Sequence, residues 1–183
     1  MNVKSVRCGK DTAARFIKNL YPGTFHYVTL CTTRPPRDKD ENGYHFLLPN
    51  EFLQQVIDGT MLNAQEFNGW YYGLSKNDLI NSKINVLPMN NEMILQMTEE
   101  NRKDYALEIV FIETLDKSRL LHILNRQTYP DCYEICRRFI SDKKDYIEND
   151  EIKDLCQYRV INYYDDTFFN YLEKIANDCF AGD

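Results

Sequence analysis

The chain has 183 residues, and 22 Lys and Arg stand against 28 Asp and Glu, which gives a formal net charge of −6. This length suits one ordinary core, or a core that carries small inserted lobes. The acidic balance argues against binding of long nucleic acid, which needs a basic face, although a local cationic cluster can still hold a small phosphorylated ligand. No apolar run approaches the roughly 20 residues that span a bilayer, and no secretory pattern opens the chain, so we expect a cytoplasmic protein without a membrane partner.

The six cysteines are scattered, without a Cys-x-x-Cys pair and without a nearby histidine cluster. Thiols of cytosolic proteins are normally kept reduced, and zinc sites need clustered ligands. We therefore expect free cysteines and no structural metal.

Hydrophobic periodicity and turn residues predict the elements of the chain. In chain order they are a short strand at 3–6, a helix from 9–10 to about 20, strands at 26–30 and 44–48, a helix at 51–57 capped by Asn50, strands at 61–67, 70–72 and 84–87, a helix at 90–98, a strand at 105–112, helices at 116–124 and 131–155, a strand at 158–161 and a helix at 165–180. Buried strands that alternate with helices favour an α/β fold with a parallel sheet and helices on both of its faces.

Gly9 and Lys10 stand between the first predicted strand and the first predicted helix. A Gly-Lys pair in this place is typical of a phosphate loop, in which backbone N–H groups and the helix dipole hold phosphate oxygens. Asp11 occupies the position where the general motif has a hydroxyl ligand for magnesium, and Thr12 can still bond a phosphate. Taken alone, the pair is a weak signal, because an ordinary helix start has the same appearance.

The phosphate-loop motif is also incomplete on its N-terminal side, since its first glycine would fall on Lys4. Two interpretations stay open: the loop is degenerate, or residues are missing between about Val6 and Arg7. We favour the second as a hypothesis, because residues 9–16 otherwise form a regular junction between a loop and a helix.

Four linked motifs follow the first helix, and their order and spacing resemble the nucleotide-monophosphate lobe of guanylate kinases. These motifs are Thr32-Thr33-Arg34-Pro35-Pro36-Arg37, Gly43-Tyr44-His45-Phe46, Glu51-Phe52 and Gly69-Trp70-Tyr71-Tyr72-Gly73. A thinner similarity continues through the strand at 110–112 to Asn162, so that the resemblance covers essentially the whole chain.

The resemblance implies the α/β fold of a P-loop nucleoside monophosphate kinase. Its core would comprise residues 1–29, 83–122 and 141–183, with an NMP-binding lobe at 30–82 and a lid at 123–140. It also implies transfer of the γ-phosphoryl group of ATP, bound with Mg²⁺, to a nucleoside or deoxynucleoside monophosphate.

The resemblance assigns roles to residues at the matching positions. The acceptor phosphate would be held by two arginines and two tyrosines, whose guanidinium forks and phenol hydroxyls suit phosphate oxygens. The acceptor set is Arg34, Arg37, Tyr44, Asn63, Tyr72 and Gly73; the ATP-binding set is Gly9, Lys10, Asp11, Thr12 and Asn162; the catalytic set is Lys10, Arg126 and Arg137. Arg138 would replace Arg137 if the alignment shifts by one residue.

The chain departs from the family where the family reads guanine. The family's serine, glutamate and hydroxyl residue correspond here to Leu30, Asn63 and Leu74. A glutamate accepts from both donors of the guanine edge, whereas a carboxamide offers one acceptor and one donor group. These differences leave the accepted base open. They also leave open a second function, that of a guanylate-kinase-like binding or scaffold module that keeps the phosphate pocket without catalysis.

Overall fold

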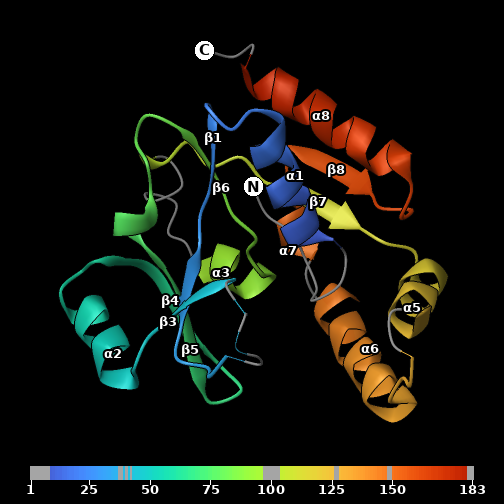
Figure 1. Cartoon of the computed structure of the whole chain (residues 1–183), viewed down its shortest axis with the longest axis horizontal. Helices are drawn as coiled ribbons and strands as arrows, with labels where there is room; N and C mark the ends of the chain where they lie inside the picture. The colour runs from blue at the N-terminus through green and yellow to red at the C-terminus, as the bar shows by residue number, and fades with distance from the viewer. Residues whose placement is uncertain are drawn as a thin grey trace. The chain divides into compact units, whose positions relative to one another are not determined.

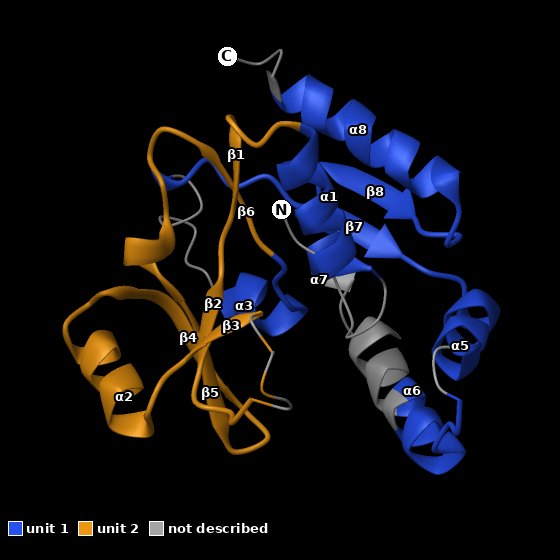
Figure 2. Ribbon diagram, viewed as in Figure 1, with its two compact units in different colours: residues 1–20, 88–183 blue, residues 21–87 orange. Residues whose placement is uncertain are grey.

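A computed structural model of the chain describes residues 9–36, 39, 41, 43–96, 104–125, 128–147 and 150–180 (Figure 1). The predicted strand at 3–6 and the proposed gap beside Val6 lie outside the described residues. The chain divides into two compact units, the first formed by Met1–Leu20 and Pro88–Asp183 and the second by Tyr21–Leu87 (Figure 2). No helix within the described ranges is both long and apolar enough to cross a membrane.

The first unit joins helices to a parallel pair of strands. Its elements are α1 (Lys10–Leu20), α3 (Asn91–Gln96), β7 (Val110–Glu113), α5 (Asp116–Asn125), α6 (Cys132–Ile147), α7 (Asp150–Asp154), β8 (Tyr158–Ile161) and α8 (Asp166–Phe180). Strands β7 and β8 run parallel, with Val110 opposite Tyr158. Helix α1 packs against α8, where the Phe16 and Phe169 rings lie 4.8 Å apart between centroids. The core is built from apolar side chains that β7, α1 and α8 turn inward, as the sequence pattern predicts.

The second unit contains two sheets and one helix. Its elements are β1 (Phe25–Tyr27), β2 (Leu30–Thr32), β3 (Tyr44–Phe46), α2 (Pro49–Ile57), β4 (Met61–Phe67), β5 (Trp70–Ser75), the 3₁₀ helix η1 (Lys76–Asp78) and β6 (Ile84–Val86). Strands β1 and β6 form a parallel pair, and the other strands form a four-stranded sheet in the order β3-β2-β5-β4. Asn68 and Gly69, at φ 53° and 78°, make the predicted tight turn between β4 and β5.

Several predicted boundaries differ from those of the structure. The predicted strand at 26–30 is divided, because β1 pairs with β6 whereas β2 enters the four-stranded sheet. Of the predicted strand at 105–112, only the part from Val110 onward forms a strand, β7, and Ala106 adopts a left-handed φ of 43° that a strand does not accept. The predicted helix at 131–155 is two helices, α6 and α7.

The start of helix α2 also differs from the prediction that Asn50 caps it. The helix begins at Pro49, so that the capping position falls on Leu48. The carboxylate of Glu51 accepts a hydrogen bond of 2.9 Å from the Leu48 backbone N–H. Proline fits the first helical position because its missing N–H is not needed there.

The four-stranded sheet has two different faces, because alternate side chains of a strand point to opposite sides. One face is covered by α2, whose buried Phe52 stacks on Tyr71 with ring centroids 5.5 Å apart. Gly73 faces the same helix, because a Cβ built on it would lie 2.9 Å from the Phe52 ring. Tyr72, which stands between these two residues in β5, therefore points to the opposite face.

We expect Gly73→Ala to destabilise the second unit by about 1–3 kcal/mol, as overpacking of a tight core does. The added methyl group would lie 2.9 Å from the Asn63 backbone oxygen and 2.9 Å from the Phe52 ring. Urea unfolding, followed by the fluorescence of Trp70, the single tryptophan, measures the effect. Gly23→Ala is the control, since nothing lies within 4 Å of its added methyl group. Equal stability of Gly73→Ala and the unmodified chain would contradict this packing.

Candidate functional site

Two threonines fix the backbone that leads to Arg34. The Thr32 hydroxyl donates a hydrogen bond of 2.9 Å to the Tyr71 carbonyl and accepts one of 3.2 Å from the Arg34 backbone N–H. The Thr33 hydroxyl accepts a hydrogen bond of 2.9 Å from the Tyr71 backbone N–H. Side-chain hydrogen bonds of Thr32 and Thr33 thus join the end of β2 to β5, in addition to the backbone hydrogen bonds between the two strands.

Arg34 is buried, with 6% of the residue exposed, and lies among aromatic rings. Its guanidinium carbon is 5.6 Å from the centroid of the Tyr44 ring and 5.6 Å from that of the Phe46 ring. The Tyr44 and Tyr72 rings meet edge to face, with centroids 6.0 Å apart. The structure therefore brings together three of the four residues predicted to hold the acceptor phosphate, which we call the Arg34 niche: Arg34, Tyr44 and Tyr72. The fourth, Arg37, lies outside the described residues.

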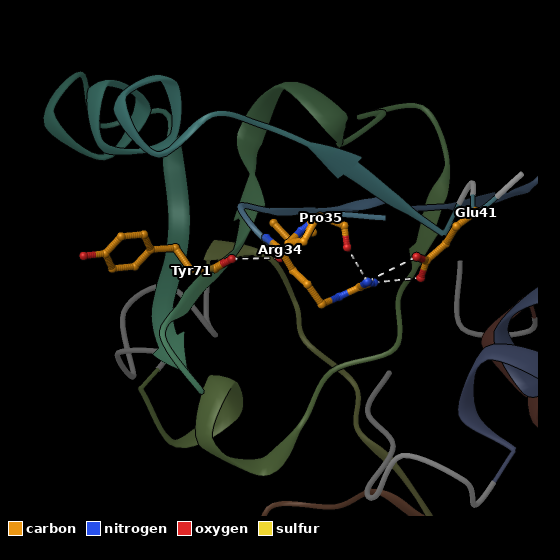
Figure 3. Close-up of polar contacts among 5 residues, drawn as sticks. Arg34, Pro35, Glu41 and Tyr71 are labelled. Atoms are coloured by element: carbon orange, nitrogen blue, oxygen red, sulfur yellow. Dashed lines mark hydrogen bonds and ion pairs between the residues drawn. The ribbon is translucent and has the colours of Figure 1, made fainter. Parts of the chain in front are cut away.

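The guanidinium of Arg34 already holds an anion of the chain itself. Both of its terminal nitrogens donate to the Glu41 carboxylate, at 2.7 and 3.2 Å, and one also donates to the Pro35 carbonyl at 2.8 Å (Figure 3). The hydrogen bond to Glu41 raises the pKa of Arg34 further, so the cation is permanent. In this bidentate contact the two terminal nitrogens of the guanidinium bind a pair of carboxylate oxygens. Arginine binds two oxygens of a phosphate in the same geometry.

Sequence reasoning missed Glu41. It belongs to a charged run between Arg37 and Tyr44, where every residue is consistent with a solvated loop. The one available signal was an acidic residue placed between two predicted phosphate ligands.

Asn63 and Gly73 lie on the paired strands β4 and β5. Asn63 is opposite Leu74 in the register and is 7% exposed. Gly73 approaches the Asn63 backbone so closely that a Cβ would lie 2.9 Å from its carbonyl oxygen. Leu30 in β2, at the position that matches the family's serine, is buried as well. The positions where the chain departs from the family therefore form a buried, uncharged surface of the second unit.

On the first unit, the residues predicted to bind ATP gather at the start of α1. Gly9 has φ +94°, and a Cβ built on it would lie 2.7 Å from the Asn162 amide nitrogen. Asn162 is buried, and its side-chain oxygen accepts from the Tyr164 backbone N–H at 2.8 Å. Lys10 is the first residue of α1, and the next two, Asp11 and Thr12, are exposed in its first turn.

The predicted lid arginines are only partly described. Arg137 lies on α6 with 57% of its side chain exposed, and it pairs with Glu134 through two contacts of 2.7 and 2.9 Å. This hydrogen bonding raises the pKa of Arg137 above its ordinary value. Arg126 and the side chain of Arg138 lie outside the described residues.

Arg119 is a further cation that sequence reasoning missed. It lies on α5, is buried, and its guanidinium carbon is 4.2 Å from the centroid of the Phe139 ring on α6. It precedes Ile123, the other buried residue of α5, by four residues, and this helical spacing is the signal that the sequence offered. The contact is internal to the first unit and couples α5 to α6.

The described cysteines are free thiols: Cys31, Cys132, Cys136, Cys156 and Cys179. Burial raises the pKa of Cys31 to about 11, with a smaller contribution from nearby Asp78. Within the described part of the chain, no three His, Cys, Asp or Glu residues are grouped closely enough to hold a metal ion.

Comparison with known proteins gives concordant results. A sequence model of the family described as guanylate kinase matches residues 4–158. A guanylate kinase of Nostoc sp. is 35% identical over 75 residues, which are 40% of this chain and only 37% of that relative. A guanylate kinase of Thermosynechococcus vestitus is 29% identical over 71% of this chain and 69% of its own length. A guanylate kinase of Campylobacter jejuni is 27% identical over 82% of this chain and 72% of its own length.

The fold is similar to that of a solved structure. The crystal structure of guanylate kinase from Anaplasma phagocytophilum superposes with a TM-score of 0.63 at 18% identity, covering 99% of this chain and 84% of that one. The expected P-loop nucleoside monophosphate kinase fold is thereby confirmed. Together with the family match over residues 4–158, this means that the chain belongs to the guanylate kinase family.

Proposed function

We propose that this protein is a kinase that transfers the γ-phosphoryl group of ATP to a nucleoside or deoxynucleoside monophosphate. The observation that carries the proposal is the Arg34 niche, in which a buried guanidinium lies 5.6 Å from one tyrosine ring that meets a second. The name of the relatives, guanylate kinase, makes GMP the first acceptor to test.

The acceptor phosphate would replace the Glu41 carboxylate on Arg34. A phosphate presents the same paired oxygens as the carboxylate, and it carries up to two negative charges against one. The hydroxyl groups of Tyr44 and Tyr72 would donate to the remaining oxygens without adding charge. Arg37 would contribute a second guanidinium, as its place in the motif implies.

The donor phosphates would lie at the start of α1. Helix N-termini attract anions through their free N–H groups and dipole, and α1 begins beside the left-handed Gly9. Lys10 would stabilise the transferring phosphoryl group, and Asn162 would contact the donor base. Positioning and neutralisation of charge carry most of the catalysis in phosphoryl transfer.

Magnesium would be bound together with ATP. Asp11 and Thr12 offer oxygen ligands in the exposed first turn of α1, and Mg²⁺ prefers oxygen donors from one or two side chains plus phosphates. The residues present therefore fit the ion, which neutralises phosphate charge when it is bound.

The lid role of residues 123–140, with Arg126 and Arg137, remains part of the proposal. Arg137 is exposed on α6, and its pairing with the neighbouring Glu134 is of the surface type that contributes little stability. A phosphate could therefore replace Glu134 at low cost.

We also propose that the core comprises 1–29, 83–122 and 141–183, with 30–82 as the acceptor lobe.

A binding module without catalysis is less well supported. Such a module needs the Arg34 niche but does not need a donor site. The close approach of Gly9 to Asn162 at the start of α1 brings together two residues predicted to bind the donor, and this favours the enzyme.

The free described thiols support a cytoplasmic location, because reducing compartments keep cysteines unpaired.

A coupled assay of ADP release tests the activity across the common ribo- and deoxyribonucleoside monophosphates, with GMP first. We expect Lys10→Met to lower kcat by about a hundredfold or more, because it removes a charge that is needed in the transition state. Circular dichroism verifies that the variant is folded.

Lys18→Met, at the other end of the same helix, is the matched control and should keep the activity of the unmodified chain. The kinase assignment would be wrong if no monophosphate yields ADP, or if Lys10→Met leaves turnover unchanged.

We expect Glu41→Gln to lower the KM for the acceptor about three- to tenfold and to leave kcat nearly unchanged. The amide still accepts a hydrogen bond from Arg34, but a neutral group competes less well with phosphate for a guanidinium than a carboxylate does. Steady-state kinetics with varied acceptor measures the change.

The control for this substitution is Glu173→Gln on an exposed position of α8, which should not change KM. A higher acceptor KM in Glu41→Gln would show that Glu41 only positions Arg34 and does not compete with the ligand.

A further inference from the structure

Gln65 carries a buried polar group that the proposed roles leave unused. It lies in β4, with 6% of the residue exposed. Its side-chain oxygen, Oε1, is fully buried and has no hydrogen-bond partner among the described residues. Buried carbonyl oxygens in proteins are nearly always paired, and an exception requires an explanation. A ligand that donates a hydrogen bond at this point would provide one.

The sheet register places Gln65 beside the Arg34 niche. Gln65 is directly opposite Tyr72 in the antiparallel pair of β4 and β5, and opposed residues point to the same face. That face is the one away from α2, because Tyr71 and Gly73, the neighbours of Tyr72, face Phe52. The carboxamide of Gln65 therefore shares a face with the tyrosine that contacts Tyr44.

A second carboxamide follows on the same strand. Asn63 lies two residues before Gln65 and is opposite Leu74, so that both amides point to one face of β4. Both residues are more than nine-tenths buried, and neither carries a charge. On this face, beside the niche, the amides of Asn63 and Gln65 thus lie opposite Leu74 and Tyr72. This composition suits a polar but uncharged heterocycle.

We propose that Gln65 determines base specificity, with Oε1 accepting a hydrogen bond from an exocyclic amino group of the acceptor's base. This rests on the proposed function, since it needs a monophosphate held in the Arg34 niche. Guanine, adenine and cytosine carry such an amino group, whereas hypoxanthine, uracil and thymine do not. A base without it would leave Oε1 buried and unpaired, and a carbonyl in its place would face Oε1 with a second acceptor.

Sites built to pair a polar group reject the analogue that lacks this group much more strongly than apolar pockets reject a missing methylene. We therefore expect kcat/KM to be about tenfold or more higher for an amino-bearing base than for the same base without the amino group. Matched pairs isolate the effect: GMP with IMP, AMP with purine ribonucleoside monophosphate, and CMP with pyrimidin-2-one ribonucleoside monophosphate.

The full chain is assayed with these pairs as the unmodified protein, as Gln65→Met and as Gln65→Glu. Methionine keeps the length of the side chain but accepts no comparable hydrogen bond, so the preference within a pair should fall to about twofold or less. Glutamate keeps an accepting oxygen at the same reach, so the preference should persist. Gln54→Met, on the exposed side of α2, is the matched control and should retain the full preference.

Two results would overturn the assignment of Gln65. One is an unmodified protein that uses both members of every pair equally well, which needs no variant and no assumption about folding. The other is a preference that survives in Gln65→Met. If no monophosphate is phosphorylated, the kinase proposal fails separately, and calorimetric binding of the same pairs then decides the role of Gln65 by the same ratios.

Discussion

The candidate acceptor site depends on one interaction, the two-pronged contact of the buried Arg34 guanidinium with Glu41. A guanidinium cannot lose its charge inside a protein, so it must be paired and hydrogen-bonded to be buried. Tyr44 adds an aromatic face to the cation. Under the proposed function, a ligand that displaces Glu41 must supply equivalent oxygens to Arg34, and a phosphate monoester does so.

Much of the fold was predictable because its signals are local. Helical periodicity located α1, α5 and α8, and the Asn68-Gly69 turn located the β4–β5 hairpin. Sheet membership was not local, which is why the predicted strand at 26–30 proved to be two strands in different sheets. The predicted strand at 105–112 begins later than expected, after Ala106 in its left-handed conformation, and an alanine gives no sequence signal for that conformation.

The site shows the same division between local and non-local information. The motifs identified Arg34, Tyr44 and Tyr72, which the structure brings together. Glu41 and Gln65 went unnoticed because a carboxylate in a charged loop and an amide in a strand are ordinary residues until their partners are known. Only the pairing of Glu41 with a buried cation, and the unpaired oxygen of Gln65, distinguish them.

The measurement that tests the central claim most directly is a crystal structure of the chain with a soaked nucleoside monophosphate. The account predicts phosphate oxygens within hydrogen-bond distance of the Arg34 guanidinium and of the Tyr44 and Tyr72 hydroxyls, with the Glu41 carboxylate displaced. A monophosphate bound elsewhere, with the 2.7 Å contact between Arg34 and Glu41 intact, would contradict it.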